Sequence, residues 1–249
     1  IKEYMAALMT SVLSNTPKLM EYIEECETNG IKVLRPDINE SGEGFTISEN
    51  GIHFGLLAIK NLGKSVIQSI VNERKNNGRY TSFQNFCERM SGHDINKRAV
   101  ESLIRSGSFD GLGLNRHQML DNFERIIDTV SENHRQQLDG QLDLFGDSEE
   151  EVSGLEIQIE SVEEYPLGQL LAMEKEIIGM YVSGNLLSQY SVYAKLMRID
   201  RISAIAKGEE KKYTDNAKVN ILCTVSAIKT HITKTGLKMC FLTLEDMTG

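Results

Sequence analysis

The 249-residue sequence predicts a mainly α-helical chain with small β elements. Apolar residues recur three and four positions apart through most of the chain, which is typical of amphipathic helices. Two stretches, 45–54 and 219–246, instead alternate with a period of two around a turn signal. With 40% hydrophobic residues, the chain can form one large domain or about two to three small domains with buried cores.

The first 30 residues predict a pair of helices. Apolar residues at helical spacing continue to Leu13. Thr16 can cap the next helix, and Pro17 fits its first turn. This second helix covers 18–27 and stops at Asn29-Gly30. The pattern by itself indicates two helices with a shared buried stripe.

A short β-hairpin is predicted at 45–54. Asn50-Gly51 separates two runs of alternating residues, and this combination is a strong hairpin signal. The apolar members are Phe45, Ile47, Ile52 and Phe54. We expect a structural element that leads the chain into the next helices.

The following segment predicts a helix, a tight glycine turn and a second helix. An apolar helical run from His53 leads to the turn at 60–64, Lys-Asn-Leu-Gly-Lys. Gly63 can adopt a positive φ and let the backbone approach another surface. The free amides that open the next helix form an anion site, and Lys60 and Lys64 add positive charge. The turn therefore predicts phosphate binding.

A second, weaker copy follows at 95–109. Its helix ends in a basic residue, Arg105, before a turn at Gly107. One such hairpin is typical of an ordinary pair of solvated helices, whereas two in tandem favour phosphate binding. The candidate DNA-binding residues are Lys60, Leu62, Gly63, Lys64, Arg98, Arg105 and Gly107.

Charge supports this interpretation. Residues 53–117 hold ten Lys and Arg against five Asp and Glu, although the whole chain has a net charge of −9. A basic region in an acidic protein is expected of a module that binds the phosphate backbone rather than the bases. We therefore expect duplex binding without sequence preference.

The runs AIKNLGKSVIQSIVNER, SFQNFCERM and INKRAVESLIRSGSFDGLGLNR resemble, in order and spacing, the tandem helix-hairpin-helix domain of the C-family bacterial replicative polymerases, the DNA polymerase III alpha subunits. The resemblance extends over essentially all 249 residues. It implies the end of a fingers-like helical domain at 1–50, the tandem helix-hairpin-helix domain at 51–117, a helix and acidic tether at 118–164, a helical connector at 165–210 and the start of a truncated OB fold at 211–249.

Acidic residues dominate 118–178, where sixteen Asp and Glu face three basic residues. A predicted helix from Met119 to Val130 is followed by an apolar pentapeptide within a polar tether. This pentapeptide consists of Gln141, Leu142, Asp143, Leu144 and Phe145. It resembles the motif with which these polymerases dock to the sliding clamp, the beta subunit.

The rest of the chain predicts an amphipathic helix and a β-hairpin. The helical pattern covers 162–190 and starts at Tyr165-Pro166. Alternation then runs from Val219, with a turn at 234–236. The resemblance implies the opening strands of an OB fold, a barrel that can bind single-stranded DNA. Two strands alone are marginally stable.

Motifs of catalysis are missing from the sequence. It has no Asp-x-Asp pair to hold two metal ions and no H-E-x-x-H, and its histidines and cysteines are scattered. We expect no catalytic residue, metal site or cofactor in this chain. The resemblance implies a longer DNA-directed DNA polymerase, a nucleotidyltransferase whose palm domain binds two Mg²⁺. The start at Ile1, without Met, also suggests a piece of a longer protein.

The expected partners are double-stranded DNA and the sliding clamp and, through the full C-terminal region, single-stranded DNA and a clamp-loader subunit. No apolar run is long enough to cross a membrane and no signal peptide is present, so a cytoplasmic location at the bacterial nucleoid is expected. Two alternatives remain: a standalone DNA-binding adaptor that bridges duplex and clamp, and a nuclease or repair factor with the same hairpins.

Overall fold

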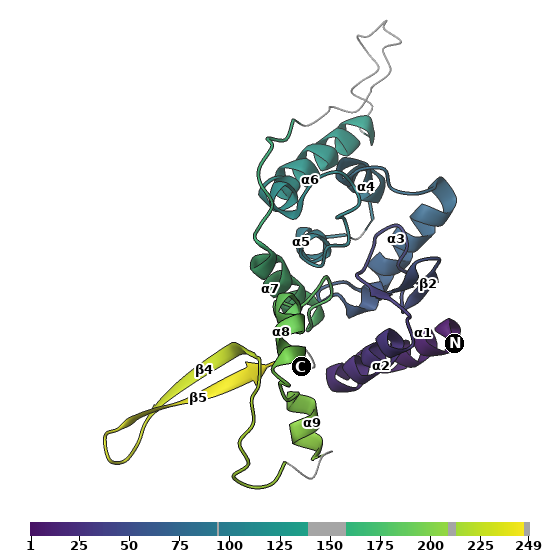
Figure 1. Ribbon diagram of the computed structural model, residues 1–249. Helices are drawn as coiled ribbons and strands as arrows, with labels where there is room; N and C mark the ends of the chain where they lie inside the picture. Colours follow the sequence, from purple (N-terminus) through teal and green to yellow (C-terminus); the bar gives the residue numbers. More distant parts are fainter. Residues whose placement is uncertain (94, 139–157, 209–212, 247–249) are drawn as a thin grey trace, which may run out of the picture. The chain divides into compact units, whose positions relative to one another are not determined.

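The computed structural model describes residues 1–93, 95–138, 158–208 and 213–246. By contact they form two compact units, 1–183 and 184–249 (Figure 1). Helices dominate, and the two small sheets hold three and two strands, which confirms the predicted fold class. No helix in the described ranges is long and apolar enough to cross a membrane.

The first unit begins with the two predicted helices, α1 (Lys2–Ser11) and α2 (Thr16–Thr28). The side chain of Asn15, not of Thr16 as predicted, caps α2 by accepting from the Lys18 amide at 3.2 Å. The two helices pack on a small sheet and share with it a core that includes Met9, Cys26 and Ile52.

The small sheet has the strand order β1-β3-β2. The predicted hairpin is confirmed: β2 (Thr46–Ser48) and β3 (Gly51–His53) are antiparallel, with Ile47 opposite Ile52. The sequence did not reveal β1 (Val33–Leu34), which pairs in parallel with β3. A strand of two residues is too short to show alternation.

After the sheet come η1 (Leu56–Ala58), α3 (Lys64–Asn77) and α4 (Phe83–Met90). The apolar run from His53 was predicted as a full helix, but it forms only this single 3₁₀ turn. His53 still belongs to β3, so too few residues remain before the hairpin for an α-helix. The 3₁₀ turn is nevertheless anchored, because Leu56 is completely buried.

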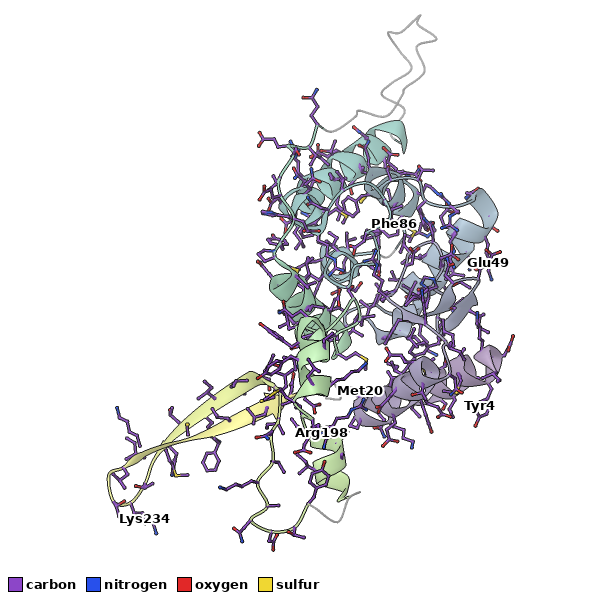
Figure 2. All side chains as sticks on the ribbon, viewed as in Figure 1. Tyr4, Met20, Glu49, Phe86, Arg198 and Lys234 are labelled. Atoms are coloured by element: carbon purple, nitrogen blue, oxygen red, sulfur yellow. The ribbon has the colours of Figure 1, made fainter. Side chains whose placement is uncertain are left out.

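The larger core of the first unit lies among α3, α4, α5 (Lys97–Arg105), α6 (Arg116–Leu138) and α7 (Leu167–Ile178). In this core Phe86, labelled in Figure 2, lies on α4. Its ring packs edge-on against Phe109, with 4.8 Å between ring centroids. The predicted helix over 162–190 is shorter than expected. It ends at Ile178 because Gly179 adopts φ 92° and closes the helix.

The second unit contains η2 (Ser188–Tyr190), α8 (Ser191–Leu196), α9 (Ile202–Lys207) and the antiparallel strands β4 (Thr224–Ile232) and β5 (Lys238–Glu245). The predicted hairpin is confirmed, although its first strand starts at Thr224 rather than Val219. Asp246 accepts from the Ile202 amide at 2.6 Å and ties the strands to α9. Side chains on both faces of the hairpin point outward (Figure 2), and Ile228 and Phe241 are more than half exposed.

Candidate nucleic-acid interface

The first hairpin joins η1 to α3, and Asn61 makes its turn. Asn61 has φ 64°, in the left-handed region that Asn tolerates better than most residues. Its amide group donates to the Ser102 hydroxyl of α5 at 3.0 Å, which holds the turn against α5. Gly63 has φ −76°. The prediction that Gly63 supplies a positive φ is therefore wrong.

Gly63 has a different role, because it leaves the start of α3 open. A Cβ added at Gly63 would have Ser65 Oγ as its nearest neighbour, at 3.9 Å. No side chain caps α3, and its first turn has no acidic residue, whereas Ser82 and Asn96 cap α4 and α5. Lys64 at the first helical position opposes the helix dipole. An external anion would satisfy the amides and offset this charge.

The two lysines of this hairpin have exposed partners. Lys60 Nζ donates to the Glu176 carbonyl oxygen at 2.7 Å, and Lys64 Nζ lies 3.0 Å from a Glu43 carboxylate oxygen. The Lys64 and Glu43 side chains are 70% and 40% exposed. Exposed pairs of this kind contribute about 0–1 kcal/mol to stability. Replacing the Glu43 carboxylate by a DNA phosphate as the partner of Lys64 would therefore cost little free energy.

The second hairpin joins α5 to α6, and Gly107 makes its turn. Gly107 has φ 79°, as expected for a glycine turn. A Cβ at this position would lie 2.2 Å from Arg116 Nη2. Glycine is thus required both by the backbone conformation and by the close approach of a side chain from the same chain.

Arg116 is the centre of a buried ion network. Its side chain is 2% exposed and donates to both Asp110 oxygens and to Glu174 Oε1, each at 2.9 Å. Burial acts to lower the pKa of the Arg116 guanidinium, but the hydrogen bonds and charges of Asp110 and Glu174 outweigh it and raise the pKa above its usual value. Glu174 also accepts from the amides of Val182 and Ser183, so the network joins the hairpin to α7 and to the residues that follow it.

The start of α6 is closed by a carboxylate of the same chain. Glu164 accepts from the backbone amides of Arg116 at 2.9 Å and His117 at 3.1 Å. Asn115 accepts from the Gln118 amide at 2.8 Å, which satisfies a third donor. In contrast to the open start of α3, the first amides of α6 already have acceptors within the chain.

Comparison with known proteins agrees with this geometry. Residues 30–119, which include both hairpins, match the helix-hairpin-helix motif. The DNA polymerase III alpha subunits of Saccharopolyspora erythraea and Borreliella burgdorferi are 38% and 37% identical to this chain over 98% and 99% of its length. That of Mycobacterium tuberculosis is 32% identical over 99%. The chain is a homologue of DNA polymerase III alpha subunits. It spans about a fifth of the length of these curated relatives, 21% in each case.

In this alpha-subunit homologue the predicted DNA-binding residues fall into two groups, one at each hairpin, with Arg98 apart from both. Lys60, Gly63 and Lys64 gather at the open start of α3 and are exposed, while Leu62 between them is buried. Arg105 and Gly107 lie at the second hairpin. Arg98 is exposed in the first turn of α5, at the opposite end of that helix from the hairpin. The structure therefore brings the first group together and keeps Arg98 apart.

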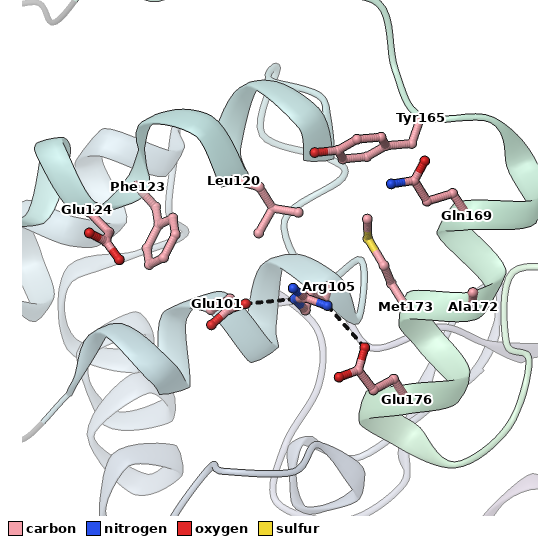
Figure 3. A pocket seen from close by; sticks show the side chains of 10 residues that line it. All are labelled: Glu101, Arg105, Leu120, Phe123, Glu124, Tyr165, Gln169, Ala172, Met173 and Glu176. Atoms are coloured by element: carbon pink, nitrogen blue, oxygen red, sulfur yellow. Dashed lines mark hydrogen bonds and ion pairs between the residues drawn. The ribbon is translucent and has the colours of Figure 1, made fainter.

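Arg105 lines an acidic pocket of about 510 Å³ between α5, α6 and α7 (Figure 3). It makes ion pairs with Glu101 at 2.8 Å and Glu176 at 3.1 Å. Glu124 also lines the pocket. These carboxylates would repel a phosphate, so the surroundings of Arg105 do not favour the predicted contact with DNA.

Sequence reasoning did not identify Arg116, Glu164 and Glu174 as parts of the interface. The sequence marks Arg116 only as a basic residue that follows Asn115 shortly after the Gly107 turn. No local pattern pairs Arg116 with Glu164 and Glu174, which come about 50 residues later. The predicted clamp-binding residues, Gln141 to Phe145, lie outside the described residues and stay a prediction.

Proposed function

We propose that this chain is the part of a replicative DNA polymerase alpha subunit that holds duplex DNA by its phosphates, without sequence preference. Similarity to alpha subunits over nearly the whole chain and the match to the helix-hairpin-helix motif support the proposal. The observation that carries it is the open start of α3, with its uncapped amides, Gly63 and the two lysines.

Backbone amides and lysines make point contacts with phosphate oxygens and have no geometry for reading base edges. A hairpin built from them should bind all duplex sequences similarly. Each phosphate contact releases counterions, so binding should weaken steeply with salt.

The test is binding of the full chain to a random-sequence duplex over a range of salt. Changing Lys60 and Lys64 together to Glu should weaken binding for every duplex sequence. The slope of log affinity against log salt concentration should become shallower by the equivalent of about two phosphate contacts. The control changes Lys32 and Lys75 to Glu. Both are exposed lysines, Lys75 at the far end of α3, and the change in net charge is equal. Equal losses in the two variants would contradict a phosphate site at the hairpin.

We also propose that Gln141 to Phe145 dock the protein to a sliding clamp. Burying Leu144 and Phe145 in an apolar pocket would contribute about 1.5–3 kcal/mol each, less the cost of ordering the segment. The result is a modest contact that becomes effective because polymerase and clamp share one DNA.

Calorimetry with the purified clamp tests this second part. Changing Leu144 and Phe145 to Ala should abolish the binding heat, while duplex binding by the same variant stays unchanged. Equal heats for the variant and the wild type would rule out Gln141 to Phe145 as the clamp-binding segment.

The whole polymerase would be a DNA-directed DNA polymerase in the bacterial cytoplasm. Template-directed synthesis uses two metal ions held by clustered carboxylates. In the described part of this chain no three His, Cys, Asp or Glu residues gather to hold a metal ion. These residues do not fit the ions, and we propose that the catalytic carboxylates belong to other parts of the polymerase.

A further inference from the structure

Donor groups of the second hairpin have carboxylate partners from a single later segment, 158–178, in addition to Glu101 on Arg105 and Asp110 on Arg116. Glu164 accepts from the first amides of α6, Glu174 from buried Arg116, and Glu176 from Arg105. Figure 3 shows the Arg105–Glu176 pair in the pocket that Tyr165 and Gln169 of the same segment also line. Three acids that are close in sequence thus contact three separate donor groups of one turn.

The part of this segment before α7, residues 158–165, is fixed along α6 by its backbone. Side chains of α6 and its cap donate to its carbonyl oxygens: Arg125 to Gln158, Gln118 to Glu160 and Asn115 to Val162, at 2.7–3.1 Å. The Tyr165 ring stacks on His117 with 4.2 Å between centroids. Glu164 is therefore held at the helix start by its neighbours on both sides.

We propose that residues 158–178 form an internal acidic cover that takes the place of DNA phosphate at the second hairpin. In this arrangement the first hairpin carries the phosphate contact. The inference rests on the proposed function and specifies which of the two hairpins acts. The cover competes with DNA because its carboxylates use the same amides and guanidinium groups that a phosphate would use.

The test removes the two outer carboxylates and leaves buried Glu174 intact. Glu164→Gln with Glu176→Gln should bind duplex about fivefold to tenfold more tightly than its control near 0.1 M salt, with a salt dependence steeper by about one contact. The control is Glu160→Gln with Glu163→Gln, which removes the same charge from exposed side chains of the same segment. Equal affinity and slope in the two proteins would overturn the proposal.

A second comparison separates this inference from the proposed function. In the wild-type background, Lys60→Glu with Lys64→Glu should weaken duplex binding and flatten its salt dependence, which tests the first hairpin. The same change in the Glu164→Gln, Glu176→Gln background should leave tighter and more salt-dependent binding than in the wild-type background, through the second hairpin. Equal residual binding in the two backgrounds would overturn the cover and leave the first hairpin supported. Thermal unfolding of each variant confirms that it is folded.

Discussion

The two hairpins share a sequence pattern, yet the structure uses their glycines and helix starts in opposite ways. The first turn leaves its glycine in open space and the following helix uncapped. The second places Arg116 against its glycine and a carboxylate on the following helix. A basic residue beside a glycine turn is therefore not enough to predict phosphate binding. By our proposal, the feature that decides phosphate binding is whether the chain itself supplies an anion at the turn.

The largest effect is expected at Gly107. An Ala there must adopt φ 79° and displace buried Arg116 from its ion pairs. The left-handed conformation costs about 1–2 kcal/mol for a residue with a Cβ, and disturbing a buried ion pair costs about 3–5 kcal/mol. We expect the free energy of unfolding to fall by about 4 kcal/mol or more, measured by urea denaturation. A loss below about 1 kcal/mol would show that Arg116 relocates easily.

A smaller loss is expected at Glu174. Glu174→Gln keeps the shape of the side chain but leaves Arg116 with Asp110 as its remaining carboxylate partner. Truncating one partner of a buried pair typically costs about 3 kcal/mol, and the amide oxygen recovers part of this. Urea denaturation should show a loss of about 2 kcal/mol. Glu163→Gln, an exposed control on the segment before α7, should show almost none.

The smallest effect on stability is expected at Gly63, where the two hairpins differ most. A Cβ added at Gly63 has its nearest neighbour at 3.9 Å, and the φ of −76° suits a residue with a side chain, so Gly63→Val should be tolerated. The free energy of unfolding should change by less than about 1 kcal/mol. Duplex affinity should nevertheless fall, because the added methyl groups would stand where the phosphate approaches. A variant that is stable and binds DNA normally would show that the start of α3 is not the contact.

The sequence by itself determined most of the secondary structure. Helical spacing located α2, α3, α6 and α7, and Asn50-Gly51 located the first β-hairpin. These features follow from local backbone preferences and from periodic burial, and both can be read from neighbouring residues. The candidate lysines and glycines of the first hairpin came from the same kind of local pattern.

Only the tertiary structure decided which hairpin is open. Asn61 takes the left-handed conformation in place of Gly63, because its side chain reaches Ser102, 41 residues away. Arg105 and Arg116 are neutralised by Glu176 and Glu174, 71 and 58 residues further along the chain. No local pattern specifies such pairings. An electrostatic contact depends on distance in space and on burial, and these are set only when α7 packs against α5.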